Sequence, residues 1–253
     1  MQTSNRDKKS IAEGANNSVQ KNGYSRIVQT LVILLSVTAG STDVIGFLGL
    51  NGLFTAHITG NLVIIAAHVI SGEGAQVAAM LSVPVFIVAV SLTRVTAGRL
   101  QSKGFGSLRP LLVLQFLLLA GFLVLSVTTG PWTDSNATNA ILAGMLGVSA
   151  MAVQNALVQI SLADAPPTAA MTTNVTRFAM AIGEVMVGID PAQVVEARRR
   201  AARTLPAIFG FALGCAGGAA CEAAFGLSSL ALPAGAALLA LLTGLAVRTE
   251  SAP

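Results

Sequence analysis

Long apolar runs separated by short polar segments dominate the hydropathy pattern of this chain. About 20 helical residues cross a hydrocarbon layer of about 30 Å, because each residue adds about 1.5 Å to a helix. Six runs reach that length, at residues 27–48, 76–98, 110–130, 139–163, 205–226 and 228–247. Two further runs, 54–71 and 169–189, are shorter or more polar. The pattern predicts an all-α fold, a polytopic membrane helix bundle.

The two weak runs leave the number of membrane crossings open. Lys and Arg in short connections favour the cytoplasmic side of a membrane. The basic sets are the N-terminal tail, residues 99–109 and residues 198–203. With six full spans and two short or re-entrant segments, all three sets lie inside, whereas eight spans place residues 99–109 outside. We favour six spans, with residues 1–26 as a flexible cytosolic tail and residues 27–253 as a single helical membrane domain.

Composition supports a membrane protein and argues against several other classes. The chain is 53% hydrophobic and 10% charged, whereas soluble domains carry about 25% charged residues. The net charge of +4 arises from basic residues beside apolar spans, so we expect no nucleic-acid partner. Neither a phosphate-binding glycine loop nor a hydrolase motif occurs, so we expect no enzyme, cofactor or metal site. The two cysteines, Cys215 and Cys221, both lie in one apolar run and predict no disulfide framework.

A short internal similarity indicates a duplicated architecture. The string TAHITGN at residues 55–61 matches TAAMTTN at residues 168–174 in four of seven positions. The halves are then residues 27–130 and 139–247, and duplicated halves around a central site are common in transporters. Chance similarity between apolar sequences is the alternative.

Asp43 is the most conspicuous ionisable residue within a run. Such a group costs about 2.5–3.5 kcal/mol at a helix centre and usually faces a bundle interior or water. It is either a proton or cation site, or a carboxylate near the membrane interface that caps the following break in the chain.

The first weak run carries a polar stripe. His57, Asn61 and His68 are spaced so that one helix would present all three on one side. The histidines could relay protons. Hydrogen bonding between helices is the interpretation we favour.

Two further patterns concern charge and packing. Arg177 and Glu184 share a predicted helix face about 10 Å apart along the axis, which is long for direct contact. Each therefore has another partner, such as Asp43 for Arg177, or the two form an ion pair that orders the bundle. Gly210, Gly214 and Gly218 form a ladder that predicts close helix contact, within one chain or between two.

Two motifs add a family resemblance. The first joins an alanine-glycine pair and an aspartate to a later string, in Ala39, Gly40, Asp43, Ile58, Thr59, Gly60 and Asn61. The second comprises Gln154, Asn155, Thr172 and Thr173, followed by Val175 and Thr176. From about residue 27 to 247 the chain resembles the YoaK-like family, small bacterial membrane proteins of unknown function.

The family register differs from the direct overlay. It matches Thr176 with Thr59, a shift of four positions, and it places Arg177 where the family pattern has glycine. We prefer this register. Residues 98–106 are also faintly similar to a loop of major-facilitator transporters, without its aspartate.

Together these features predict a permease of the bacterial inner membrane, embedded in the lipid bilayer, with a cytoplasmic N-terminus. The sequence does not predict its oligomeric state. Arg177 would suit a small anionic solute. The predicted path residues are Asp43, His57, Thr59, Asn61, Asn155, Thr173, Arg177 and Glu184. The alternative is a non-transporting membrane scaffold or assembly protein in which the same residues join helices.

Overall fold

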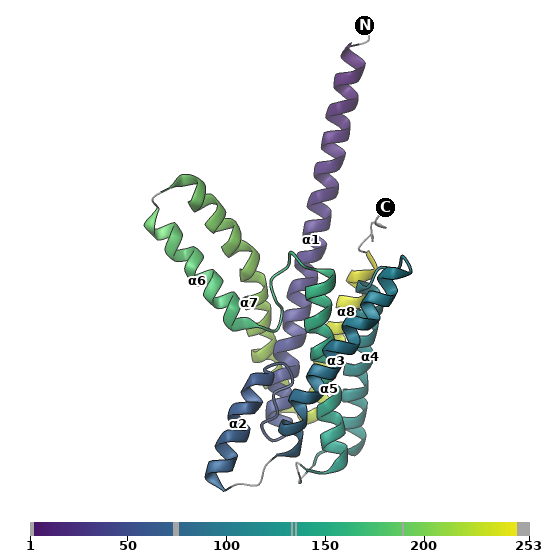
Figure 1. Ribbon diagram of the computed structural model, residues 1–253, viewed down its shortest axis with the longest axis vertical. Coiled ribbons are helices and arrows are strands. Elements are labelled where there is room, and N and C mark those ends of the chain that lie inside the picture. Colours follow the sequence, from purple (N-terminus) through teal and green to yellow (C-terminus); the bar gives the residue numbers. More distant parts are fainter. Residues whose placement is uncertain (1–2, 73–75, 133, 135, 189, 247–253) are drawn as a thin grey trace.

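A computed structural model of the chain describes residues 3–72, 76–132, 134, 136–188 and 190–246, with side chains from residue 26 onward. This part of the chain is helical and forms no strand (Figure 1). The helices are α1 (Thr3–Gly49), α2 (Ile58–Ser71), α3 (Val77–Ser102), α4 (Leu108–Thr129), α5 (Thr138–Ser161), α6 (Met171–Val187), α7 (Pro191–Phe225) and α8 (Ala231–Ala246), with a 3-10 turn at Gly226–Leu230 between the last two. The predicted all-α fold is confirmed.

Long apolar helices confirm the membrane class. Within the described residues, five segments are long and apolar enough to cross a bilayer: Arg26–Gly49, Val77–Ser102, Leu108–Thr129, Thr138–Ser161 and Pro191–Ala246. The last segment contains both α7 and α8. The 14-residue α2 is a shorter apolar helix. The number of crossings stays a prediction.

Two helices, α1 and α7, begin more than ten residues before their apolar runs. α7 begins at Pro191, whose lack of an N–H suits a first helical position, and the Asp190 carboxylate accepts the N–H of Ala192 at 2.9 Å. α1 extends back to Thr3 across the predicted flexible tail, a segment without the proline that would break a helix. Whether the tail is flexible stays a prediction, and residues 247–253 of the predicted domain lie outside the described residues.

The helix ends define a lower and an upper end of the bundle in Figure 1. At the lower end, Gln76 Nε2 before α3 donates to the Leu50 carbonyl after α1 at 2.8 Å. Leu227, after α7, lies there against Gly49 and Gly130. The upper end comprises the start of α4 and the ends of α5 and α8.

Polar contacts fix the upper end and the direction of α8. The hydroxyls of Ser107 and Ser161 lie 2.9 Å apart. The Arg109 guanidinium donates to the Leu245 carbonyl at 3.0 Å. Because Leu227 lies at the lower end, the chain reverses between α7 and α8, and α8 ascends.

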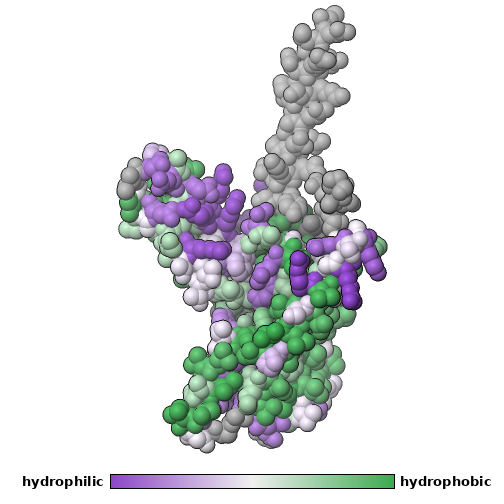
Figure 2. All heavy atoms as spheres, in the orientation of Figure 1, coloured by the Kyte–Doolittle hydropathy of each residue, from purple (hydrophilic) through white to green (hydrophobic). Residues whose placement is uncertain are grey.

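Basic residues gather at the upper end. Residues 99–109 form the connection of α3 to α4, and residues 198–203 lie in the first part of α7. Figure 2 shows hydrophilic residues over these segments, while hydrophobic residues cover the lower part of this face. The six-span prediction requires these sets to share one side.

The two halves of the chain have the same helix order but opposite directions. α1 descends and α5 ascends, and each is followed by a loop, a short helix and two longer helices (Figure 1). α1 packs mainly on α7 and α8, whereas α5 packs mainly on α3 and α4. The first helix of each half therefore packs against the last two helices of the other half, as in an inverted repeat.

The glycine ladder of α7 lies directly against the backbone of α1. A Cβ added at Gly210 would lie 2.9 Å from the Ile33 carbonyl oxygen, and one at Gly214 would lie 2.4 Å from that of Val37. On the other helix, a Cβ at Gly40 would lie 2.3 Å from the Phe211 carbonyl oxygen. The structure places this close contact within one chain.

We predict that Gly214→Ala destabilises the protein by about 1–3 kcal/mol, because the methyl group meets backbone that cannot move aside locally. Gly217→Ala is the matched control. Its Cβ would lie 3.8 Å from Leu232 Cδ2, an ordinary contact, and alanine favours the helix by about 1 kcal/mol. Thermal unfolding of the detergent-solubilised variants tests the pair, and an equal or higher Tm for Gly214→Ala contradicts the prediction.

Candidate functional site

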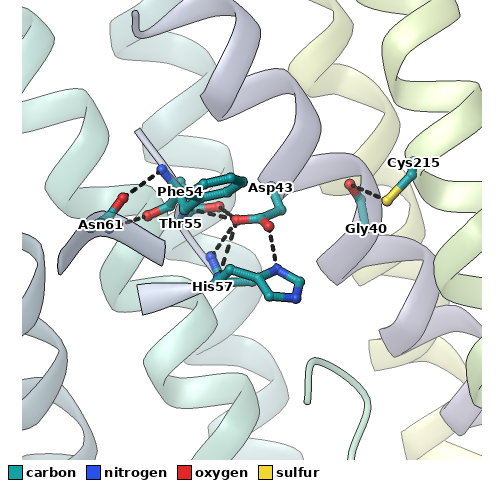
Figure 3. Close-up of polar contacts among 8 residues, drawn as sticks. Gly40, Asp43, Phe54, Thr55, His57, Asn61 and Cys215 are labelled. Carbon is teal, nitrogen blue, oxygen red and sulfur yellow. Dashed lines mark hydrogen bonds and ion pairs between the residues drawn. The ribbon is translucent and has the colours of Figure 1, made fainter. Parts of the chain in front are cut away.

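The Asp43 carboxylate of α1 binds the loop that precedes α2 (Figure 3). Asp43 is 4% exposed. Its Oδ1 accepts the backbone N–H groups of Thr55 at 2.8 Å, Ala56 at 2.7 Å and His57 at 3.3 Å. Its Oδ2 lies 2.6 Å from His57 Nδ1. The carboxylate therefore holds three consecutive N–H groups and one imidazole.

This contact shows that the loop returns into the bundle. Asp43 precedes the end of α1 at Gly49 by about 9 Å along the helix axis. Because the loop is bonded at the level of Asp43, α2 begins inside the bundle. The capping interpretation of Asp43 agrees with its bonds to the loop, and its position near the membrane interface stays a prediction.

The hydrogen bond to Asp43 orients the His57 ring. An ionised carboxylate only accepts hydrogen bonds, so Nδ1 of His57 is the donor. In a neutral imidazole the other nitrogen, Nε2, is then an acceptor. Figure 3 shows this nitrogen pointing away from Asp43, and 38% of the His57 side chain is exposed. In the neutral ring this nitrogen is therefore a hydrogen-bond acceptor with an open approach.

A cavity of about 570 Å³ lies beside this pair, between α1, α2 and α7. Its polar lining includes Asp43, His57 and Thr59, and its aromatic walls are Phe47, Phe54 and Phe211. Ring centroids lie 4.7 Å apart for Phe47 and Phe54, and 5.6 Å apart for His57 and Phe211. We call this cavity the Asp43 pocket.

Asn61 of α2 binds the backbone of the same loop at Phe54. Its Oδ1 accepts the Phe54 N–H at 2.9 Å, and its Nδ2 donates to the Phe54 carbonyl and to Ser82 Oγ, both at 2.8 Å. The predicted stripe is therefore wrong as a common helix face. His57 precedes the helix and turns to Asp43, and His68 lies outside the lining of the Asp43 pocket.

The second half repeats this loop geometry. Asn174, the fourth residue of α6, donates to the carbonyl of Pro167 at 2.6 Å, seven positions earlier, as Asn61 does to Phe54. The residues before the two helices, His57 and Ala170, have φ/ψ of −87°/63° and −91°/72°. These matches support the direct overlay of residues 55–61 on 168–174 and correct the shifted register.

On the corrected register, Thr173 takes the position of Gly60, and Arg177 marks no missing glycine. A Cβ at Gly60 would lie 2.8 Å from the Phe54 ring. The smaller Pro167 replaces Phe54, so a side chain fits at Thr173.

A neutral amide contacts the matching loop in the second half. Gln154 Nε2 donates to Thr168 Oγ1 at 2.9 Å and to the Leu35 carbonyl at 2.8 Å, and its Oε1 accepts from Gln115 at 2.7 Å. Thr168 matches Thr55, and Ala170 matches His57. The acid and imidazole therefore belong to the first half. Sequence reasoning missed Gln115, whose role depends on contact between α4 and α5.

The other path candidates lie away from the Asp43 pocket. Thr173 and Arg177 are exposed on α6, and Glu184 of α6 pairs with Arg200 of α7. Asn155 donates to the Met151 carbonyl within α5 at 2.9 Å. The predicted Asp43 partner for Arg177 and the predicted pair of Arg177 with Glu184 are both wrong, because α6 and the start of α7 form a hairpin that points away from the bundle (Figure 1).

Comparison with known proteins shows a family. The sequence model of the family described as "Protein of unknown function (DUF1275)" matches residues 31–243. The chain belongs to this family. It is similar to the UPF0700 transmembrane protein YoaK of Bacillus subtilis (strain 168), at 35% identity over 98 residues.

The matched segment is 38% of this chain and 41% of that relative, so the chain aligns with less than half of the relative's length. No solved structure matches. The YoaK-like resemblance is confirmed and supports a multi-pass membrane protein of the DUF1275 family. The likeness to major-facilitator transporters stays a prediction.

We predict that Asn61→Ala lowers the free energy of unfolding more than Asn174→Ala, by about 1–3 kcal/mol. Asn61 satisfies both Phe54 backbone groups and contacts Ser82, whereas within the described residues Asn174 Oδ1 accepts no hydrogen bond. Pro167 has no N–H to offer it. A buried group left without a partner costs about 1–3 kcal/mol. Parallel unfolding of both variants in detergent measures the difference, and equal losses argue against it.

Proposed function

We propose that this DUF1275 protein is a carrier that moves a small solute through the Asp43 pocket. The observation that supports this function best is a buried acid bonded to a partly exposed imidazole beside a cavity, at a place where non-helical chain returns into an apolar bundle. Intramembrane ionisable groups commonly mark substrate or ion pathways. Non-helical backbone at that depth is tolerated where protein or water covers it.

The position of the pocket between the two halves adds support. Asp43, His57 and Thr59 come from the first half, while Phe211 and Cys215 on α7 come from the second. Carriers with inverted repeats bind their solutes between such halves, next to short discontinuous helices. A movement of the α7 wall relative to α1 and α2 would change the opening of the pocket.

The predicted anionic solute has lost the side chain that suggested it. We predicted an anionic solute from Arg177, and that side chain is exposed on α6, outside the pocket lining. The pocket itself contributes a carboxylate.

A non-transporting scaffold or assembly protein is the second candidate. One observation favours it: Asp43 uses both carboxylate oxygens to hold its own loop. In that case the pair stabilises the fold and needs no solute.

We further propose six membrane crossings in the bacterial inner membrane, with the N-terminus and all basic sets on the cytoplasmic side. The basic residues share the upper end of the bundle (Figure 2), and such residues favour the cytoplasm. α2 and α6 then enter the membrane without crossing it.

We predict that a cysteine at Lys103, in a background with Cys215 and Cys221 replaced by serine, is protected from a membrane-impermeant maleimide added to intact cells. The matched variant Thr129→Cys lies at the other end of α4 and should react. Permeabilised cells provide the control for reactivity. Labelling of Lys103→Cys in intact cells contradicts the six-span orientation.

We predict that vesicles containing the protein take up at least one member of a panel of labelled metabolites faster than empty vesicles. Asp43→Asn should lose at least nine-tenths of that uptake. Asp164→Asn, in the matching loop of the second half and exposed, should keep it. Size-exclusion profiles of both variants check folding. Uptake no faster than in empty vesicles for every solute supports the scaffold.

A further inference from the structure

We propose that the Asp43 pocket selects a small organic cation, a protonated primary amine on an apolar or aromatic body. This inference rests on the binding site of the proposed function and names its ligand class. Three features of the pocket support it: a hydrogen-bond acceptor on the neutral His57 ring, a carboxylate and aromatic walls.

The acceptor is His57 Nε2. Asp43 accepts the proton-bearing Nδ1 at 2.6 Å, and this contact leaves Nε2 with a lone pair directed away from the carboxylate (Figure 3). A ligand that meets this nitrogen must supply an N–H or O–H group. An anion without a proton to donate offers no such group.

The pocket presents a carboxylate. Its lining contains Asp43 and, within the described residues, no Lys or Arg. The N–H groups of residues 55–57, in the loop before α2, already bond this carboxylate. An anionic ligand near these groups would therefore meet like charge.

The walls suit the body of such a cation. Phe47, Phe54 and Phe211 line the cavity together with Val44 and Val63. Aromatic faces attract cations and contribute about 0.5–2 kcal/mol, more when water is excluded. A volume of about 570 Å³ lies within the range of about 300–1,000 Å³ that small-molecule pockets have.

The test measures equilibrium binding to the full chain in lipid nanodiscs, with four probes of similar body. Benzylammonium carries charge and donors, benzyltrimethylammonium carries charge alone, benzyl alcohol carries a neutral donor, and benzoate is an anion. We expect benzylammonium to bind at least tenfold more tightly than the other three. If benzoate binds as tightly as benzylammonium or more tightly, the pocket does not select a cation. If benzyltrimethylammonium binds equally well, the ligand does not donate a hydrogen bond to Nε2.

Two matched pairs of variants locate the binding. His57→Phe should weaken the binding of benzylammonium at least tenfold, whereas His68→Phe, on α2 outside the pocket lining, should not. Phe211→Leu removes a wall without touching the Asp43–His57 contact and should weaken binding severalfold, whereas the exposed Phe209→Leu should not. Unchanged binding in both His57→Phe and Phe211→Leu overturns the proposal.

Cys215 supplies a native reporter, because it lines the pocket. In a Cys221→Ser background, benzylammonium should slow maleimide labelling of Cys215 at least fivefold, and benzoate should leave it unchanged. If benzylammonium binds and protects Cys215 from labelling, the ligand class is supported. If the vesicles then take up no solute, only the proposed carrier function is contradicted. If the vesicles take up other solutes but benzylammonium neither binds nor protects Cys215, the ligand class is contradicted and the proposed carrier function still stands.

Discussion

The bond between one buried carboxylate and one stretch of non-helical backbone determines the rest of this structure. In an apolar bundle an isolated charge and an unpaired N–H are both costly. Asp43 and the loop at residues 55–57 each supply what the other lacks, since the carboxylate accepts and the three N–H groups donate. Neither group is stable in the bundle alone, so the loop before α2 and the Asp43 carboxylate of α1 stabilise each other.

This constraint also creates the Asp43 pocket. Because the loop is held about 9 Å above the end of α1, α2 starts within the bundle and leaves it at an angle (Figure 1). The space between its start and α7 is the cavity that His57 faces. On the other side, α7 approaches α1 backbone to backbone through Gly210 and Gly214. That contact brings Phe211 and Cys215 to the pocket, so the closest packing in the bundle also positions one wall of the site.

Much of the fold could be predicted from the sequence, because hydropathy and length decide which segments are helices in a membrane. Asp43, His57 and Asn61 were also recognisable, since polar groups are rare in apolar runs. Their partners were not. Periodicity placed His57 on a helix face, but its backbone lies before the helix, in a loop that no local pattern specifies. Arg177 and Glu184 were assigned to the bundle because their run is apolar on average, and their true setting depends on the hairpin with α7, a tertiary feature. Gln115 became visible only through its contact with Gln154.

The two halves share a backbone geometry but differ in chemistry, and the difference indicates a division of roles. Where the first half has Asp43, His57 and a loop N–H at Phe54, the second has the Gln154 amide, Ala170 and Pro167. In the second half the Gln154 amide donates to the Thr168 hydroxyl, and within the described residues no acid or imidazole is bonded to residues 168–170. The acid and imidazole therefore distinguish the first half. Because an ionisable group in an apolar bundle is costly and commonly marks a functional site, this difference supports our proposal that the Asp43 pocket, and not the helix packing, is the site of function.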